Sequence, residues 1–221
     1  MAVIETPGST RPDTDPRLRA GIGFVVVFLA GLAPTFGTYP TPTSTPAQVL
    51  AYFSGHHVVT SINELSQAVA AVGLVVFTAG LAATFGGRAA PQLVAAGTLA
   101  ASALFVGAAL FNVLSLPELA DQPALAAAIY HLGFMIGGPG HVVALAVLIG
   151  TTAIAGRRSG RLPGWLTVAG FVIAALGLLS ALNFATPMLP SALVVPFIPA
   201  GRFPGYLFLA ATAVVLRRER T

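Results

Sequence analysis

The stretch SINELSQAVAAVGLVVFTAGLAATF occupies residues 61–85, and APQLVAAGTLAASALFVGAALFNVL occupies residues 90–114. Only residues 86–89 separate these two apolar runs. An α-helix rises about 1.5 Å per residue, so about 20 residues cross the hydrocarbon core of a bilayer. Neither run has the polar stripe of a helix on a soluble protein, and neither alternates as a barrel strand does. The pair therefore predicts two transmembrane helices joined by a short basic connection.

Four further apolar runs indicate four further membrane spans. One is interrupted by the sequence Gly-Gly-Pro-Gly at residues 137–140, and the last has an unclear start because Pro196, Pro199 and Pro204 interrupt it. A polar tail, which we expect to be disordered and cytoplasmic, precedes the first run. The runs cover residues 18–37, 125–155, 162–182 and 199–216, between tails at residues 1–17 and 218–221. The sequence thus predicts an all-α bundle of six spans.

The first run also resembles the apolar part of a signal peptide. The small residues Gly31 and Ala33 could imitate a cleavage site, but Pro34 directly after Ala33 disfavours cleavage there, so we expect a retained span. Residues 38–60 form a loop rich in Pro and Thr before the second span. Within this loop, residues 46–53 fit a short interfacial helix with Thr45 as its N-cap.

The composition supports the membrane assignment and excludes several chemistries. Hydrophobic residues make up 56% of the chain and charged residues only 8%, whereas soluble domains carry about 25% charged residues. The chain has no Cys, which excludes disulfides, thiolate metal sites and dithiol redox chemistry. It also has no Lys, which excludes Schiff-base chemistry. The arginines lie beside apolar runs, so the basic balance indicates membrane orientation and not a nucleic-acid partner.

The distribution of arginines predicts the orientation of the six spans. Ten arginines fall on the side that holds both termini, and only Arg202 falls on the other side. Because cytoplasmic loops carry an excess of positive charge, we expect both termini in the cytoplasm. Glu64, Glu118 and Asp121 then lie on the outer side. The ten arginines are Arg11, Arg17, Arg19, Arg88, Arg157, Arg158, Arg161, Arg217, Arg218 and Arg220.

Strongly polar side chains gather in the outer half of the predicted spans. His141 lies 16 residues before Arg157, about 24 Å along a helix, and Arg202 lies 15 residues before Arg217, about 22 Å. The inner halves contain nothing more polar than Thr. Ionisable groups inside a membrane mark functional sites because their burial is costly. We therefore predict an outward-facing polar pocket, with the candidate ligand-binding residues Glu64, Asn112, His131, His141, Asn183 and Arg202.

Each candidate also has a structural explanation. Arg202 could pair with Glu64 and join two helices, or extend toward the interface. His131 could be a hydrated interfacial residue. His141 could satisfy the backbone carbonyls that Pro139 leaves without partners.

The leading functional hypothesis is a non-catalytic membrane protein whose pocket binds a lipid, a small molecule or a partner subunit. The alternative is a transporter or permease, although the inner halves lack the polar groups of an ion pathway. A second alternative is an outward-facing enzyme that depends on zinc or haem, with His57, His131, His141 and Glu64 as candidate metal ligands. No cofactor is predicted. The expected partners are the lipid bilayer and a homo-oligomer or partner subunit.

The segment RLPGWLTVAG at residues 161–170 carries a resemblance. Together with the final span and Arg217-Arg218, it resembles bacterial six-span membrane proteins classed as a domain of unknown function. In those proteins a basic loop with a Leu-Pro-x-Trp-Leu pattern precedes the fifth helix. The resemblance implies six spans in a bacterial inner membrane. It implies no activity and no catalytic residue.

Overall fold

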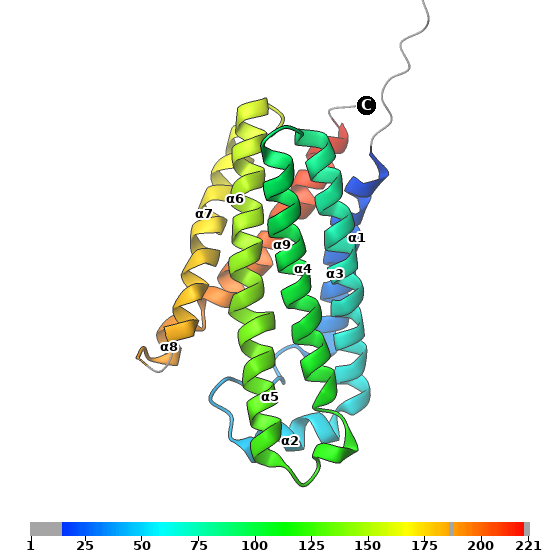
Figure 1. The fold of residues 1–221 in the computed structure, drawn as a ribbon, viewed down its shortest axis with the longest axis vertical. Coiled ribbons are helices and arrows are strands. Elements are labelled where there is room, and N and C mark those ends of the chain that lie inside the picture. The colour runs from blue at the N-terminus through cyan, green and yellow to red at the C-terminus, as the bar shows by residue number, and fades with distance from the viewer. Residues whose placement is uncertain (1–14, 186–187, 219–221) are drawn as a thin grey trace, which may run out of the picture.

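The computed structural model describes residues 15–185 and 188–218 (Figure 1). The expected tails at residues 1–17 and 218–221 therefore lie largely outside the described residues. Within the described residues, six helical segments are long and apolar enough to cross a membrane, which confirms the predicted all-α bundle. The segments are Pro16–Thr35, His57–Phe85, Ala89–Val113, Pro123–Ser159, Gly164–Ala185 and Ser191–Arg218. The chain is a polytopic helical membrane protein.

The described residues form nine α-helices, with short 3₁₀ and π-helical turns between some of them. Turns of 3₁₀ helix flank α1 at Pro16–Arg19 and Ala33–Thr35, and a π-helical turn, Ile136–Gly140, joins α5 to α6. A further 3₁₀ segment, Ser180–Ala185, follows α7. The helices are α1 (Ala20–Leu32), α2 (Pro46–Gly55), α3 (His57–Phe85), α4 (Ala89–Val113), α5 (Pro123–Met135), α6 (His141–Ser159), α7 (Gly164–Leu179), α8 (Ser191–Val194) and α9 (Phe197–Arg218).

Local signals explain where two of these helices begin. Thr45 accepts a hydrogen bond from the Gln48 amide, and the Gln48 side chain accepts one from the Thr45 amide, so a capping box starts α2. The long helix of the last span, α9, starts at Phe197, two residues before the expected residue 199. Pro199 occupies the first turn of α9, where its missing N–H has no helical partner to lose.

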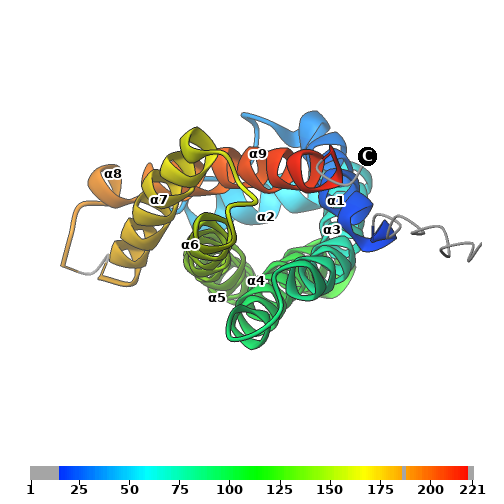
Figure 2. The same ribbon diagram turned by 90° about the horizontal axis from the view of Figure 1, so that it is seen from above.

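The six spans form a closed ring in the order α1, α3, α4, α6, α7 and α9 (Figure 2). The start of α1 and the end of α9 lie at the same end of the bundle, together with the α3–α4 and α6–α7 connections (Figure 1). We call this the basic end, because it carries Arg17, Arg19, Arg88, Arg157, Arg158, Arg161, Arg217 and Arg218. The opposite end, formed by α2, α8 and the loops before α2 and α5, is called the α2 end.

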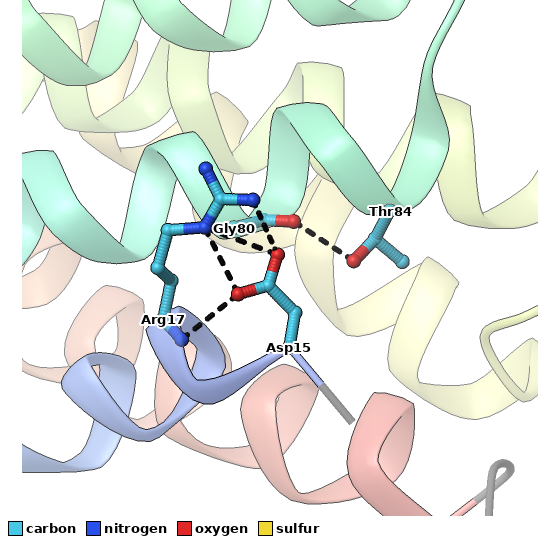
Figure 3. Close-up of polar contacts among 4 residues, drawn as sticks. All are labelled: Asp15, Arg17, Gly80 and Thr84. Carbon is cyan, nitrogen blue, oxygen red and sulfur yellow. Dashed lines mark hydrogen bonds and ion pairs between the residues drawn. The ribbon is translucent and has the colours of Figure 1, made fainter. Parts of the chain in front are cut away.

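Several polar side chains near the basic end bond to residues close by in the sequence. Arg17 forms an ion pair with Asp15, with 2.6 Å between Nη2 and Oδ2, and Thr84 donates to the Gly80 carbonyl of its own helix at 2.8 Å (Figure 3). The buried hydroxyls of Thr78 and Thr152 likewise donate to carbonyls four residues earlier. These bonds require no contact between distant parts of the chain.

Two apolar clusters hold the bundle together. The larger one runs through α1, α3, α4, α6, α7 and α9, and the smaller one joins α2 to α4 and α5 through Phe53, Leu114 and Tyr130. At one point the backbones of α4 and the π-helical turn nearly touch: a Cβ on Gly107 would lie 2.6 Å from the Gly137 Cα. This close approach fixes the position of the π-helical turn against α4.

Candidate functional site

The π-helical turn contains Pro139, which has no N–H to donate to the helix. Arg202, on the first turns of α9, donates from Nη2 to the Gly137 carbonyl and, at 3.4 Å, to the Gly138 carbonyl. The group that contacts the carbonyls of the interrupted helix is thus a guanidinium from another span. Such π-helical insertions occur frequently at functional sites.

His141 does not satisfy these carbonyls, contrary to the structural explanation considered above. Its ring is fully buried, with Nδ1 2.8 Å from the Ala100 carbonyl and Nε2 2.8 Å from the Tyr206 hydroxyl. Because a carbonyl can only accept, Nδ1 donates to Ala100 and Nε2 of the neutral ring accepts from Tyr206. Both nitrogens are therefore occupied, and His141 joins α6 to α4 and α9.

A cavity of about 180 Å³ lies beside Arg202, in the half of the bundle nearer the α2 end. We call it the Arg202 pocket. Asn63 and Gln67 supply further polar groups to its wall, and α1, α3, α4, α5, α9 and the loop before α2 all contribute. Its aromatic wall consists of Phe28, Tyr39, Phe111, Tyr130 and Phe134. The pocket is thus mainly aromatic, with three polar side chains.

Glu64 lies just behind this wall and is 2% exposed. The Tyr39 hydroxyl donates to its Oε1 at 2.6 Å, Asn63 Nδ2 donates to the same oxygen at 3.0 Å, and Gln67 Nε2 donates to Oε2 at 3.2 Å. Glu64 is therefore held by neutral donors, and the ion pair with Arg202 considered from the sequence is not formed. Burial, reinforced by the neighbouring carboxylate, raises the pKa of the Tyr39 phenol, which keeps it a donor.

Two polar atoms of the pocket residues are buried without a partner. They are Arg202 Nε, a donor, and Asn63 Oδ1, an acceptor. Among the residues that the structure describes, no carboxylate lies within ion-pair distance of Arg202. A buried polar atom without a hydrogen bond costs about 1–3 kcal/mol, more when it is charged. The residues that line the pocket thus keep one donor and one acceptor that the described chain does not satisfy.

The other predicted ligand-binding residues lie elsewhere. Asn112 and Glu64 line a separate groove of about 190 Å³ between α3 and α4. Asn183 is buried and donates to the Ser180 and Val194 carbonyls, both at 2.9 Å, so it joins the end of α7 to α8. His131 is exposed on α5, with Nδ1 2.7 Å from the Ala127 carbonyl of its own helix.

The candidate metal ligands are not brought together. Over residues 15–185 and 188–218, no group of three or more His, Asp or Glu side chains could hold a metal ion. The reason is their separate placement: His57 and His131 are exposed, His141 is buried between helices, and Glu64 is surrounded by neutral donors. The set His57, His131, His141 and Glu64 does not form one site.

Sequence reasoning missed the two tyrosines that build the pocket. Tyr39 comes from the loop before α2, 25 residues before Glu64, and the Tyr130 hydroxyl donates to the Pro40 carbonyl across 90 residues at 2.5 Å. This second bond holds the loop over the pocket. No spacing in the sequence indicates either contact, because a Thr/Pro-rich loop looks like a simple connection.

Comparisons with protein-family models, with curated proteins and with solved structures each found no match to this chain.

Proposed function

We propose that this membrane protein binds, in the Arg202 pocket, a small molecule with an aromatic or apolar body and an anionic group. The observation that carries the proposal is Arg202 itself. Its side chain lines the cavity, has no carboxylate partner in the described chain and keeps Nε without a hydrogen bond. A guanidinium in a membrane span is costly unless it is paired, so such residues mark ligand sites.

The chemistry of the wall defines the ligand class. A carboxylate would accept from the guanidinium in the paired geometry that arginine favours. Asn63 Oδ1 would accept a hydrogen bond from a hydroxyl or amine of the same molecule. Aromatic side chains favour stacked or edge contacts with a ring. A cavity of about 150 Å³ holds a benzene molecule, so about 180 Å³ suits one ring with small substituents.

Binding is favoured over catalysis and transport. The pocket wall includes no His, Ser, Thr, Asp or Glu among the described residues, and therefore lacks the usual nucleophiles and general bases. On the side toward the basic end, Phe28 packs edge-on against Tyr206 at 4.8 Å, and Tyr206 binds His141. Phe28 and Tyr206 belong to the larger apolar cluster, so the pocket is bounded on this side by that packed core.

We also propose that both termini lie in the cytoplasm, so that the Arg202 pocket faces outward. Support comes from the basic end, which gathers arginines as cytoplasmic loops do. As part of the same proposal, the protein lies in a bacterial inner membrane and belongs to the six-span family whose basic loop carries a Leu-Pro-x-Trp-Leu pattern. Trp165 of this loop is 66% exposed at the start of α7, where an interfacial anchor is expected.

A thermal-unfolding experiment in lipid nanodiscs tests the binding proposal. Benzoate and 4-hydroxybenzoate are compared with the neutral analogues benzamide and benzyl alcohol. A ligand that binds only the folded state raises the unfolding midpoint, so the two acids are expected to stabilise the protein and the neutral molecules are not. Equal shifts from acids and neutral analogues would refute a role for the Arg202 charge.

Variants locate the effect. Arg202→Gln should abolish the shift, whereas Arg157→Gln, which removes an exposed arginine of the basic end, should keep it. Ile198→Phe fills the pocket without altering its charge and should also abolish the shift. Uptake of radiolabelled benzoate into proteoliposomes distinguishes transport, because a binding protein gives a stoichiometric signal and no accumulation.

A further inference from the structure

A second cavity, of about 380 Å³, lies at the basic end between the start of α4 and the end of α6. Two arginines contribute to its wall, Arg88 from the α3–α4 connection and Arg158 from the last turn of α6. Gln92 and Ser159 add neutral polar groups. We call this the Arg88–Arg158 cavity. It shares no lining residue with the Arg202 pocket.

Among the residues that the structure describes, no nearby acid balances the charge of this cavity. Within the described chain neither Arg88 nor Arg158 has an ion-pair partner. Asp15, at the same end, pairs with Arg17, whereas Glu64, Glu118 and Asp121 belong to the half nearer the α2 end. Two guanidinium groups that share a cavity repel each other unless an anion lies between them. The cavity therefore favours an anionic ligand.

The backbone adds to the same preference. The N-cap position of α4, Arg88, makes no side-chain capping hydrogen bond, but Pro91 in the first turn has no N–H and the Ala90 amide donates to the Gly86 carbonyl, so the backbone acts mainly through the helix dipole. The positive end of the α4 dipole points toward this turn. Gly86 and Gly87 adopt positive φ values of 59° and 50°, which turn the chain sharply and place Arg88 against the cavity.

One wall of the cavity is continuous with the lipid-facing surface. Ile154 of α6 lines the cavity and is 42% exposed, and Val147, two turns earlier on the same face, is 46% exposed. A molecule with its anionic group between Arg88 and Arg158 could lay an acyl chain along this face. That arrangement matches a phospholipid at the edge of the bundle.

We propose that the Arg88–Arg158 cavity binds the phosphodiester headgroup of an anionic phospholipid. The shared recognition chemistry is a phosphate held by two guanidinium groups near the positive end of the α4 dipole. Basic pockets between transmembrane helices bind anionic headgroups in this way. The proposal does not depend on the function of the Arg202 pocket.

Native mass spectrometry of the purified protein tests this assignment. Binding of phosphatidylglycerol is compared with binding of phosphatidylcholine, and inorganic phosphate forms a separate arm. In the double variant R88Q/R158Q the first phosphatidylglycerol site should weaken by about tenfold or more. The matched control R19Q/R157Q removes the same charge from the same end, outside the cavity, and should change binding less than about twofold.

A second variant keeps every arginine in place. Gln92→Glu puts a carboxylate into the cavity with almost no change of shape, and it should also weaken the first phosphatidylglycerol site. Equal losses in R88Q/R158Q and R19Q/R157Q would overturn the proposal, because binding would then reflect surface charge alone. Phosphate binding that needs Arg88 and Arg158, with no phosphatidylglycerol bound there, would overturn the lipid assignment.

Discussion

The two halves of this bundle treat polar groups differently. Toward the basic end, Thr78, Thr84 and Thr152 donate within their own helices, the arginines lie mostly at the surface, and one of them, Arg161, donates to the Thr84 carbonyl of α3. Toward the α2 end, the ionisable side chains of Glu64 and Arg202 bond to partners from distant parts of the chain, Tyr39 and Gly137. Local bonds stabilise a helix wherever it lies, whereas contacts between distant segments build one particular cavity. The difference supports placing the proposed ligand site in the half nearer the α2 end.

The largest effect is expected from breaking the close contact between α4 and the π-helical turn. Gly107→Leu places a side chain within 2.6 Å of the Gly137 backbone, so the two helices must separate. Overpacking of this kind costs about 1–3 kcal/mol, and more against backbone. We expect a clear fall in the thermal unfolding midpoint and loss of benzoate binding. Gly23→Leu on α1 is the control, since a Cβ there meets nothing within 4 Å.

A smaller effect is expected from Arg202→Lys. The ammonium keeps the charge but lacks Nε and the planar donor geometry of the guanidinium. Benzoate should bind about tenfold more weakly, as expected for losing a hydrogen bond to a charged group. Isothermal titration in nanodiscs measures the change. Unaltered affinity would show that charge alone matters, and the proposed role of Nε would then be wrong.

Removal of single hydroxyls compares the two halves directly. Tyr39→Phe removes a donor to the buried Glu64 carboxylate and should destabilise the protein by about 1–3 kcal/mol. Thr78→Val removes a bond inside one helix and should cost about 0.5 kcal/mol, because the carbonyl keeps its helical partner. Denaturant unfolding in detergent micelles measures both. Equal costs would contradict the contrast between local and long-range polar contacts.

The smallest effect concerns alkaline pH. Burial raises the pKa of Tyr39 above its ordinary value of 10, so the unfolded chain loses this proton first as the pH rises. The contribution of Tyr39 is therefore fully present below about pH 10 and declines above it. Tyr39→Phe should lose less stability than the wild type between about pH 8 and about pH 11. Parallel curves for the two proteins would argue against a buried phenol.

Features that depend on residues close together in the sequence could be predicted from it. The apolar runs predict the six spans, Thr45 and Gln48 predict the start of α2, and the depth of Arg202 follows from its distance to Arg217. The spacing of prolines left the start of α9 open, because Pro199 is compatible with a helix start as well as with a loop.

The site itself depends on contacts that the sequence does not reveal. Arg202 reaches Gly137 across 65 residues, and Tyr39 reaches Glu64 from a loop. The depth of His141 suggested a ligand, but Ala100 and Tyr206 occupy both of its nitrogens. Burial can thus be estimated from position along a span, whereas the choice of partner depends on how the spans pack.

The most direct test of the account is thiol accessibility at Gln67, which lines the Arg202 pocket. Because the chain has no Cys, Gln67→Cys and the control Thr78→Cys, on the same helix toward the basic end, each carry one thiol. A membrane-impermeant maleimide should label Gln67→Cys from outside intact cells, benzoate should protect it, and Thr78→Cys should stay unlabelled. Labelling of Gln67→Cys only in inside-out vesicles, or unaffected by benzoate, would contradict an outward-facing ligand pocket.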